Sequence, residues 1–190
     1  IEQVITQLKP AVIINASAYT AVDKAEAEQD EAYLINATAV EYLANAATKH
    51  NIRLLHISTD FVFDGSKNTP YTVDDQTNPI NVYGATKLAG ELAIKAYSPT
   101  NAAIVRTSWV YSSHGNNFVK TMLRLMAEKD ELNVVSDQIG CPTNATGLAK
   151  YLWQLAEQEA LEPIYHYSDL GVASWYDFAV AIQHCAFEQG

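Results

Sequence analysis

The chain has 190 residues, of which 48% are hydrophobic and 18% charged, and its formal net charge is -10 at pH 7. This composition is that of a globular protein large enough to bury a core, and the acidic balance argues against binding of nucleic acid. No apolar run approaches the roughly 18 residues of a membrane span, and Ile1 opens no signal peptide, so we expect no membrane contact and a cytoplasmic location.

Short apolar runs alternate with longer stretches of helical periodicity, which is typical of an α/β protein with a largely parallel sheet. The sequence opens on what looks like a helix. In chain order we then expect strand 11–16, helix 26–49, strand 52–58, a polar loop over 64–80, helix 81–97, strand 103–108, helix 116–129, strand 133–136, helix 144–158, strand 164–167 and helix 174–188. Ser174 and Asp177 predict a capping box at the start of the last helix.

The glycine pattern sets a limit on the nucleotide-binding function. A doubly wound nucleotide-binding fold normally opens with a strand, a glycine-rich turn and a helix whose N-terminus receives the pyrophosphate. None of the eight glycines here forms a GxGxxG motif. We therefore expect the sequence to be a fragment, or to have lost the opening of its fold.

Tyr83 and Lys87 lie four residues apart in the predicted helix 81–97 and therefore share one face of it. An isolated phenol titrates near about 10, but a neighbouring ammonium favours the phenolate, so the pair can exchange a proton with a substrate oxygen. This chemistry belongs to enzymes that act on carbonyls or alcohols. An arbitrary YxxxK is more often a Tyr and a Lys at the edge of a core, so the interpretation depends on further motifs.

Two strand ends add polar groups to this picture. Thr59 and Asp60 follow strand 52–58, and the carboxyl ends of strands are where open α/β sheets bind ligands. The Thr59 hydroxyl could bind the carbonyl oxygen that Tyr83 protonates, and Asp60 could orient a sugar hydroxyl, although a turn or capping role is the commoner one for such residues. Strand 11–16 runs into small residues that would let a planar ring approach the backbone, and a tight turn explains them equally well.

Several segments together resemble the dTDP-4-dehydrorhamnose reductase family of extended short-chain dehydrogenases/reductases. They are NASAYTAVDKAE, STDFVFDG, NVYGATKLAGE, RTSWVY with GNNF, and DQIGCPT, in that order. The resemblance implies a Rossmann-like, doubly wound, largely parallel sheet without its glycine-rich turn, and part of a small C-terminal substrate domain. We expect a partial dinucleotide-binding domain over 1–132, with the remaining Rossmann elements and part of the substrate-binding subdomain over 133–190.

The resemblance also implies a reaction, in which NADPH or NADH delivers hydride to C4 of dTDP-4-dehydro-L-rhamnose. Tyr83 would donate the proton to the C4 oxygen, Lys87 would hold the nicotinamide ribose and lower the pKa of the phenol, and Thr59 would polarise the carbonyl. The positions that match the family's contacts are Ala18, Tyr19, Thr20, Tyr83 and Lys87 for the cofactor, and Thr59, Asp60 and Trp109 for the sugar.

Departures from the family pattern limit what we expect of the chain. Without the opening and the C-terminal part of the family's sequence, we expect this chain alone to hold the cofactor poorly and to be inactive. The residue that distinguishes NADPH from NADH also lies in the missing opening. Thr146 stands where relatives often carry an acidic residue implicated in metal-bridged pairing of subunits, so we predict no metal and leave a homodimer open.

Two other functions stay open, because the same motifs serve them. One is a reductase or epimerase of the same family acting on another nucleotide sugar. The other is a regulatory subunit that has this fold but no activity. Neither the five histidines nor Cys141 and Cys185 have metal-site spacing, so we expect structural or surface histidines and reduced cysteines.

Overall fold

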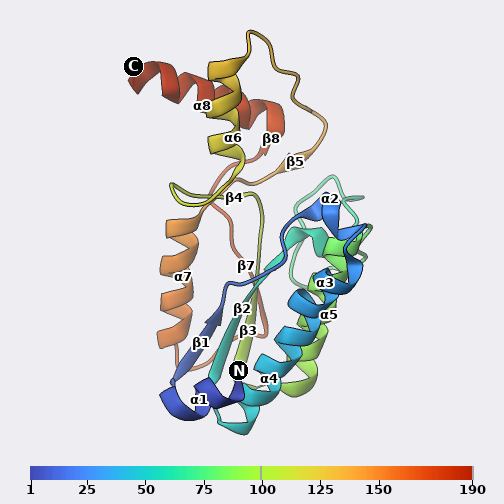
Figure 1. Ribbon diagram of the computed structural model, residues 1–190, viewed down its shortest axis with the longest axis vertical. Coiled ribbons are helices and arrows are strands. Elements are labelled where there is room, and N and C mark those ends of the chain that lie inside the picture. Colours follow the sequence, from blue (N-terminus) through green and yellow to red (C-terminus); the bar gives the residue numbers. More distant parts are fainter. Residues whose placement is uncertain (99, 190) are drawn as a thin grey trace. The chain divides into compact units, whose positions relative to one another are not determined.

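A computed structural model describes residues 1–98 and 100–189 of the chain (Figure 1). Contacts divide the chain into two compact units, Ile1–Thr107 with Leu152–His166, and Ser108–Tyr151 with Tyr167–Gly190. Helix α7 (Ala145–Glu157) contributes residues to both. The domain division of this chain that we predict after residue 132 stays a prediction. Among the described residues, no helix is both long and apolar enough to cross a bilayer.

A four-stranded parallel sheet in the order β1-β2-β3-β7 forms the centre of the first unit. Its strands are β1 (Val12–Asn15), β2 (Arg53–Thr59), β3 (Ala102–Thr107) and β7 (Ile164–His166). The helices are α1 (Glu2–Leu8), α2 (Val22–Ala25), α3 (Gln29–Tyr33), α4 (Ala39–Lys49) and α5 (Val82–Tyr97). Figure 1 shows α4 and α5 along one face of this sheet and the last part of α7, from Leu152 on, along the other. The parallel α/β sheet and these four predicted strands are confirmed.

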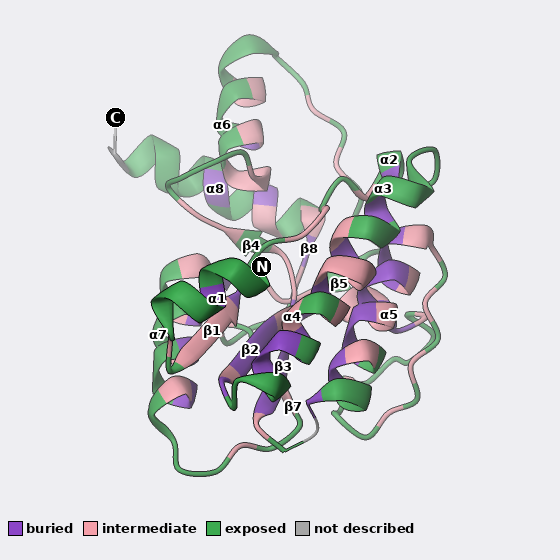
Figure 2. Cartoon of the chain, turned by 60° about the horizontal axis from the view of Figure 1, so that its bottom comes forward, coloured by how far each residue is buried: buried purple, intermediate pink, exposed green. Residues whose placement is uncertain are grey.

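The core of the first unit lies between the sheet and the α4 and α5 helices. Every residue of β3 is buried, as the colours of Figure 2 show for this strand and much of β2. On α4 the buried face is made of small side chains, including Ala44 and Ala47, so the helix can approach the sheet closely. Burial of apolar residues on both faces of a strand is what gives the strands their continuous apolar runs.

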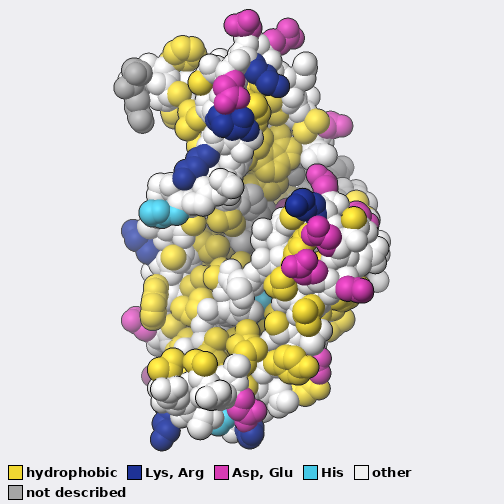
Figure 3. Space-filling model, viewed as in Figure 1, with side chains coloured by type: hydrophobic (Ala, Val, Ile, Leu, Met, Phe, Trp, Pro, Cys, Tyr) yellow, Lys and Arg dark blue, Asp and Glu magenta, His cyan; other side chains and the backbone are white. Residues whose placement is uncertain are grey.

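The predicted helix 26–49 needs a correction at its start. Residues 22–25 form the separate helix α2, the next helix begins at Gln29, and residues Leu34–Thr38 make a π-helical turn before α4. Two acidic residues of this segment have specific partners. A carboxylate oxygen of Glu26 accepts a hydrogen bond from the Val82 amide (2.8 Å), and the Glu28 carboxylate accepts one from the Tyr19 hydroxyl. Figure 3 shows acidic side chains gathered over this α2 and α3 region.

Helix α5 starts where the sequence predicts it, because the Asn81 side chain accepts a hydrogen bond from the Gly84 amide (2.7 Å). Two glycines let other backbone segments approach this helix. A Cβ atom on Gly84 would lie 2.2 Å from the Phe61 carbonyl oxygen, and one on Gly90 would lie 2.3 Å from the Asn36 carbonyl oxygen. Both positions therefore require glycine, for packing rather than for backbone conformation.

A buried ion pair connects α5 to the sheet. Glu91 is fully buried and Arg106 is 3% exposed. The arginine donates from Nε to Glu91 Oε1 (2.9 Å) and from Nη2 to Oε2 (2.7 Å), and the Ser58 hydroxyl also donates to Oε1 (2.6 Å). This two-pronged geometry compensates for the loss of hydration of both charges.

The second unit contains helices α6 (Phe118–Glu128) and α8 (Trp175–Gln189) and short strand pairs. These strands are β4 (Val110–Tyr111) with β6 (Thr143–Asn144), and β5 (Ile139–Gly140) with β8 (Ala173–Ser174). Side chains from α6 and α8, among them Met122, Ala179 and Ile182, form its core. The capping box is confirmed, because Ser174 N donates to Asp177 Oδ2 (2.9 Å) and Asp177 N donates to Ser174 Oγ (3.0 Å).

The predicted strand 133–136 is wrong. This segment is irregular: Val134 packs against the core between α6 and α8, and the Val135 carbonyl accepts a hydrogen bond from the Tyr176 amide (3.0 Å). Its apolar residues are therefore buried by helices, and periodicity alone cannot distinguish that from burial in a sheet.

Replacing Glu91 with Leu should lower the free energy of unfolding by about 3–5 kcal/mol, because it leaves the Arg106 charge buried without its counter-ion. Urea unfolding of the full-length protein measures this change. The matched control is the double variant Glu91→Leu/Arg106→Met, which removes both charges and should be more stable than Glu91→Leu alone. If the double variant loses as much free energy of unfolding as Glu91→Leu and Arg106→Met lose together, the two side chains are not coupled.

Candidate active site

The end of β2 positions the first two candidate residues. Thr59 is buried and caps the short 3-10 turn Asp60–Val62, accepting a hydrogen bond from the Phe61 amide at 3.2 Å. Its hydroxyl donates to Asp60 Oδ1 at 3.0 Å. The capping role that we considered for this segment is therefore present, and it holds the hydroxyl and the carboxylate together.

Tyr83 lies in the first turn of α5, with its ring edge-to-face against Phe61 (centroids 5.4 Å apart). Burial raises the pKa of the phenol and the Asp60 charge acts in the same direction, while a hydrogen-bond interaction with Thr59 opposes both. The sequence led us to expect a lowered pKa, and this expectation is wrong for the chain in this state. Tyr83 is a neutral phenol at pH 7, which is the form that can donate a proton.

Lys87 lies one helical turn after Tyr83 and is 2% exposed. In the described part of the chain, two groups lie within hydrogen-bond distance of its Nζ, the Ile57 carbonyl oxygen (2.7 Å) and His56 Nε2 (3.4 Å). Burial lowers the pKa of Lys87 to about 8, against the opposing effect of Glu91. The amine therefore binds β2, and the groups that shift the pKa of Tyr83 are Thr59 and Asp60 rather than Lys87.

Asp60 is the third titratable group beside Tyr83. Burial raises the pKa of its carboxyl to about 6, while hydrogen bonds from Thr59 and from the backbone oppose the shift. The carboxylate is therefore ionised at neutral pH at a cost in folding free energy. Its negative charge favours the neutral form of the phenol.

The turn after β1 is tied to α5 by a residue that the sequence analysis missed. Asn36, in the π-helical turn, is 1% exposed. Its Oδ1 accepts from the Tyr19 amide (2.8 Å), and its Nδ2 donates to the Tyr19 carbonyl oxygen and to Thr86 Oγ1 (both 3.0 Å). The sequence offered one signal for this role, a polar residue on the buried face of a predicted helix. The π-helical turn is a second indication, visible only in the structure, because such turns are frequent at functional sites.

The candidate cofactor segment Ala18–Tyr19–Thr20 is thus fixed beside α5. The Tyr19 ring packs in the same apolar cluster as Tyr83, together with Ala25, Ala32 and Phe61. Its hydroxyl is engaged by Glu28, which raises the pKa of Tyr19 to about 12. The structure therefore brings this segment, Thr59, Asp60, Tyr83 and Lys87 to one side of the sheet.

His56 is the second residue that the sequence analysis missed as part of the site. We expected structural or surface histidines, and this one is fully buried in β2 between Asn15 and Lys87. Burial holds the pKa of its imidazole well below the usual value, and the Lys87 charge acts in the same direction. His56 is therefore neutral. Across the described residues, no three His, Cys, Asp or Glu side chains form a group that could hold a metal ion.

Trp109 belongs to the second unit. Its backbone has φ of 48°, which is uncommon for a residue with a side chain, and its indole stacks on Trp175 with centroids 3.5 Å apart. Gly140 also lies against it, because a Cβ atom there would be 2.5 Å from Trp109 Cε2. The indole is thus fixed by its surroundings, and its contact with a sugar stays a prediction.

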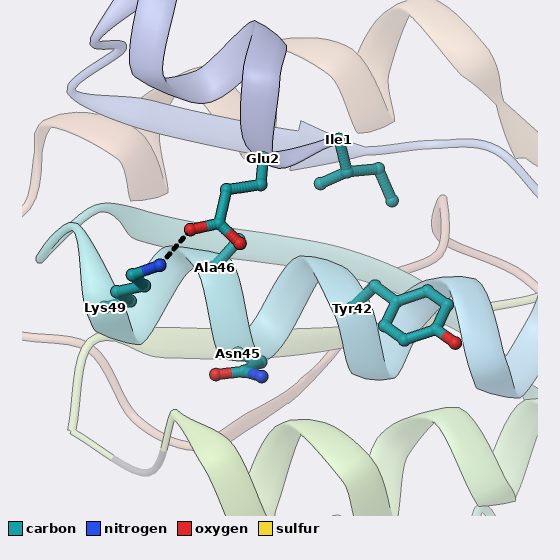
Figure 4. Close-up of a pocket in the computed structure, with 6 residues that line it drawn as sticks. All are labelled: Ile1, Glu2, Tyr42, Asn45, Ala46 and Lys49. Carbon is teal, nitrogen blue, oxygen red and sulfur yellow. Dashed lines mark hydrogen bonds and ion pairs between the residues drawn. The ribbon is translucent and has the colours of Figure 1, made fainter.

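A separate hollow of about 520 Å³ lies between α1 and α4 (Figure 4). Glu2 and Lys49 meet across it as an ion pair, and the other lining residues are Ile1, Tyr42, Asn45 and Ala46. None of these residues is among those that the sequence points to. The hollow therefore adds nothing to the candidate site.

Comparison with known proteins agrees with these features. The model of one protein family, described as the RmlD substrate binding domain, matches residues 1–189. The chain is 49% identical over 184 residues to a dTDP-4-dehydrorhamnose reductase of Aggregatibacter actinomycetemcomitans, covering 94% of this chain and 62% of that protein. It therefore spans less than two thirds of that relative's length.

Solved structures give the same match. A dTDP-4-dehydrorhamnose reductase from Bacillus anthracis str. Ames in complex with NADP is 44% identical, with a TM-score of 0.94 over 98% of this chain and 66% of that one. An orthologue from Clostridium acetobutylicum ATCC 824 is 44% identical, with a TM-score of 0.93 over 98% of this chain and 65% of that one.

Replacing Asp60 with Asn should stabilise the full-length protein relative to the parent, and this advantage should be larger at pH 8 than at pH 4. The raised pKa means that the folded protein binds more protons than the unfolded chain between about pH 4 and 6, so the parent loses stability as the pH rises through this window. The variant has no such loss, and its advantage should grow by about 1–3 kcal/mol across the window. Urea unfolding at several pH values measures the difference, and an advantage that does not change with pH would contradict it.

Proposed function

Because the chain belongs to the family of the RmlD substrate binding domain, we propose that the full-length protein reduces the C4 keto group of dTDP-4-dehydro-L-rhamnose to give dTDP-L-rhamnose. The reductant is a nicotinamide dinucleotide, NADPH or NADH. Relatives of this chain carry the name of that reaction, and one solved relative is described as a complex with NADP. The observation that carries the proposal is the neutral Tyr83 held beside Thr59 and Asp60, with Lys87 one turn further along α5.

The proposed mechanism needs no covalent intermediate. When bound, the cofactor supplies the hydride that C4 receives. Tyr83 donates its proton to the C4 oxygen, and its raised pKa keeps the phenol protonated for this step at neutral pH. The Thr59 hydroxyl has one proton, which donates to Asp60 Oδ1 in this structure; on binding of the substrate it turns to donate to the same oxygen and so stabilises the negative charge that develops on it. The phenol then recovers a proton from solvent.

The residues around Tyr83 suit a dinucleotide and a sugar. The turn Ala16–Ser17–Ala18 has small side chains that leave the backbone after β1 open to a planar ring, and Asn36 holds this turn in place. We propose that Ala18, Tyr19 and Thr20 contact the cofactor and that Lys87 donates to its nicotinamide ribose. Asp60 and Trp109 are the proposed sugar contacts beside Thr59.

Replacing Tyr83 with Phe in the full-length protein should lower kcat about 100- to 10,000-fold, because it removes the proton donor. Affinity for NADPH should change little, since the ring and its packing against Phe61 remain. Absorbance loss from the nicotinamide measures turnover, and fluorescence titration measures binding. Tyr97→Phe is the matched control, because this hydroxyl lies on the same helix, is partly exposed and binds Glu41. Unchanged turnover in Tyr83→Phe would refute the assignment.

The substrate itself is tested by mixing full-length protein with dTDP-4-dehydro-L-rhamnose and either reduced cofactor. Oxidation of the cofactor with formation of dTDP-L-rhamnose supports the proposal and identifies the cofactor. Turnover with another nucleotide sugar alone would indicate a different reductase or epimerase of the same family. Cofactor binding without turnover, together with a stoichiometric partner enzyme, would indicate a regulatory subunit.

The location and the assembly of the protein are also proposals. We propose that it works in the cytoplasm and carries no metal, and we leave a homodimer open. Cell fractionation, metal analysis and light scattering of the full-length protein test these three statements.

A further inference from the structure

The backbone of Trp109 is held in an uncommon conformation. This residue lies between β3 and β4, and its φ of 48° is in the left-handed region, which residues with a side chain rarely adopt. The Thr143 amide donates to the Trp109 carbonyl oxygen (3.2 Å), and the Ser108 hydroxyl donates to the Cys141 carbonyl oxygen (2.7 Å). The backbone is therefore fixed on both sides of Trp109, and it determines the direction in which the indole leaves the chain.

The Trp175 indole covers one face of the Trp109 indole. The two rings are 10° from parallel and their centroids are 3.5 Å apart, so they overlap almost completely. Aromatic pairs prefer an offset or edge-to-face arrangement, because full overlap sets two negative ring faces against each other. The residues around the stack therefore impose it, rather than the attraction between the two rings.

Trp175 is supported independently of Trp109. It opens α8, whose first turn is fixed by the capping box described above, and β8 just before it pairs with β5. Trp175 Nε1 donates to Gln138 Oε1 (3.2 Å), and the centroid of the Phe118 ring lies 4.5 Å from that of the Trp175 ring. The stack therefore transmits position from Trp175 to Trp109.

The N–H group of Trp109, unlike that of Trp175, is not used within the protein. In the part of the chain that the structure describes, Trp109 Nε1 has no hydrogen-bond partner, and this atom is not buried. Gly140 lies against the same part of the ring, where a Cβ atom would be 2.8 Å from Nε1. Because Gly140 has no side chain, nothing at this position covers the N–H group. Trp109 thus combines an apolar ring with a free donor, and both features suit a sugar.

We propose that Trp175 is a positioning residue that holds the Trp109 indole as a preformed contact for the sugar ring of the substrate. That a sugar binds at Trp109 rests on the function proposed above. A contact that is rigid before binding loses less conformational entropy when the ligand arrives, so it contributes more to affinity. Trp175 acts through Trp109 and needs no contact of its own with the substrate.

The stack can be measured without any ligand. An aromatic ring shields protons that lie over its face, so the ring protons of Trp109 should resonate upfield of their usual positions. In full-length protein labelled with ¹³C-tryptophan, the Trp109 signals are those that disappear in Trp109→Phe. They should move downfield in Trp175→Leu, which removes the covering ring, and stay in place in Trp153→Phe, which changes an exposed ring on α7. Trp109 signals that do not move in Trp175→Leu would overturn the proposal.

Binding separates the sugar contact from a general loosening of the fold. We expect Trp175→Leu to weaken binding of dTDP-L-rhamnose about 10-fold and to leave the affinity for dTDP, which lacks the sugar, nearly unchanged. Trp175→Phe keeps a flat ring and should restore most of the affinity. Titration calorimetry of the full-length protein measures both ligands. An equal loss for both would overturn the proposal, because Trp175 would then only stabilise the fold.

A matched control and a double variant complete the test. Phe178→Leu removes another ring of the same helix, which packs on Tyr111 and Phe118, and should change the affinities for the two ligands by the same factor. In a Trp109→Ala background, Trp175→Leu should cause no further selective loss. A selective loss that persists there would overturn the proposal. A parent that binds neither ligand would instead refute the proposed function, and the ring-proton shifts would still decide whether Trp175 holds Trp109.

Discussion

Helix α5 carries two ionisable side chains, Lys87 and Glu91, into the buried face of the sheet, and neither can remain there without polar partners. Glu91 finds Arg106 and Ser58, and Lys87 finds the Ile57 carbonyl oxygen. Because these partners belong to two neighbouring strands, the helix can dock in one register only. The orientation of Tyr83 at the start of the same helix follows from this docking.

The burial that makes docking specific also determines the chemistry. Removal of water raises the pKa of Tyr83 and of Asp60 and lowers that of Lys87, so each group is shifted toward its uncharged form. The proposed carbonyl reduction consumes one proton, and an uncharged phenol is a group that can supply it.

Much of this arrangement was predictable from the sequence. Long apolar runs identified four strands of the sheet, and the carboxyl ends of parallel strands necessarily share one edge, so Thr59 and the Ala18–Tyr19–Thr20 turn had to lie near α5. Short strands were not predictable, because a strand of two residues, such as Val110–Tyr111, is too short to show a hydrophobic periodicity. The segment 133–136 misled us because burial against helices gives the same apolar run as burial in a sheet.

The positions of buried polar groups were harder to predict than the fold. Asn36 reaches the Tyr19 backbone because a π-helical turn rotates it inward, and local sequence does not specify that turn. His56 lies within an apolar strand, where the sequence cannot show which residues face it across the sheet. Likewise, YxxxK spacing places two side chains on one face without saying whether the amine turns toward the phenol or toward the strand.

The two glycines on α5 give a way to follow this protein through evolution. Gly84 and Gly90 are required by the carbonyl oxygens of Phe61 and Asn36, and neither glycine takes part in the chemistry. The pattern YGxxKxxGE therefore combines two independent constraints, one from the proposed catalysis and one from packing. A descendant that has lost enzymatic activity is free to replace the Tyr and the Lys, but must keep both glycines as long as it keeps the fold. Relatives that keep both glycines but have replaced the Tyr or the Lys would therefore be members that act by binding rather than by catalysis.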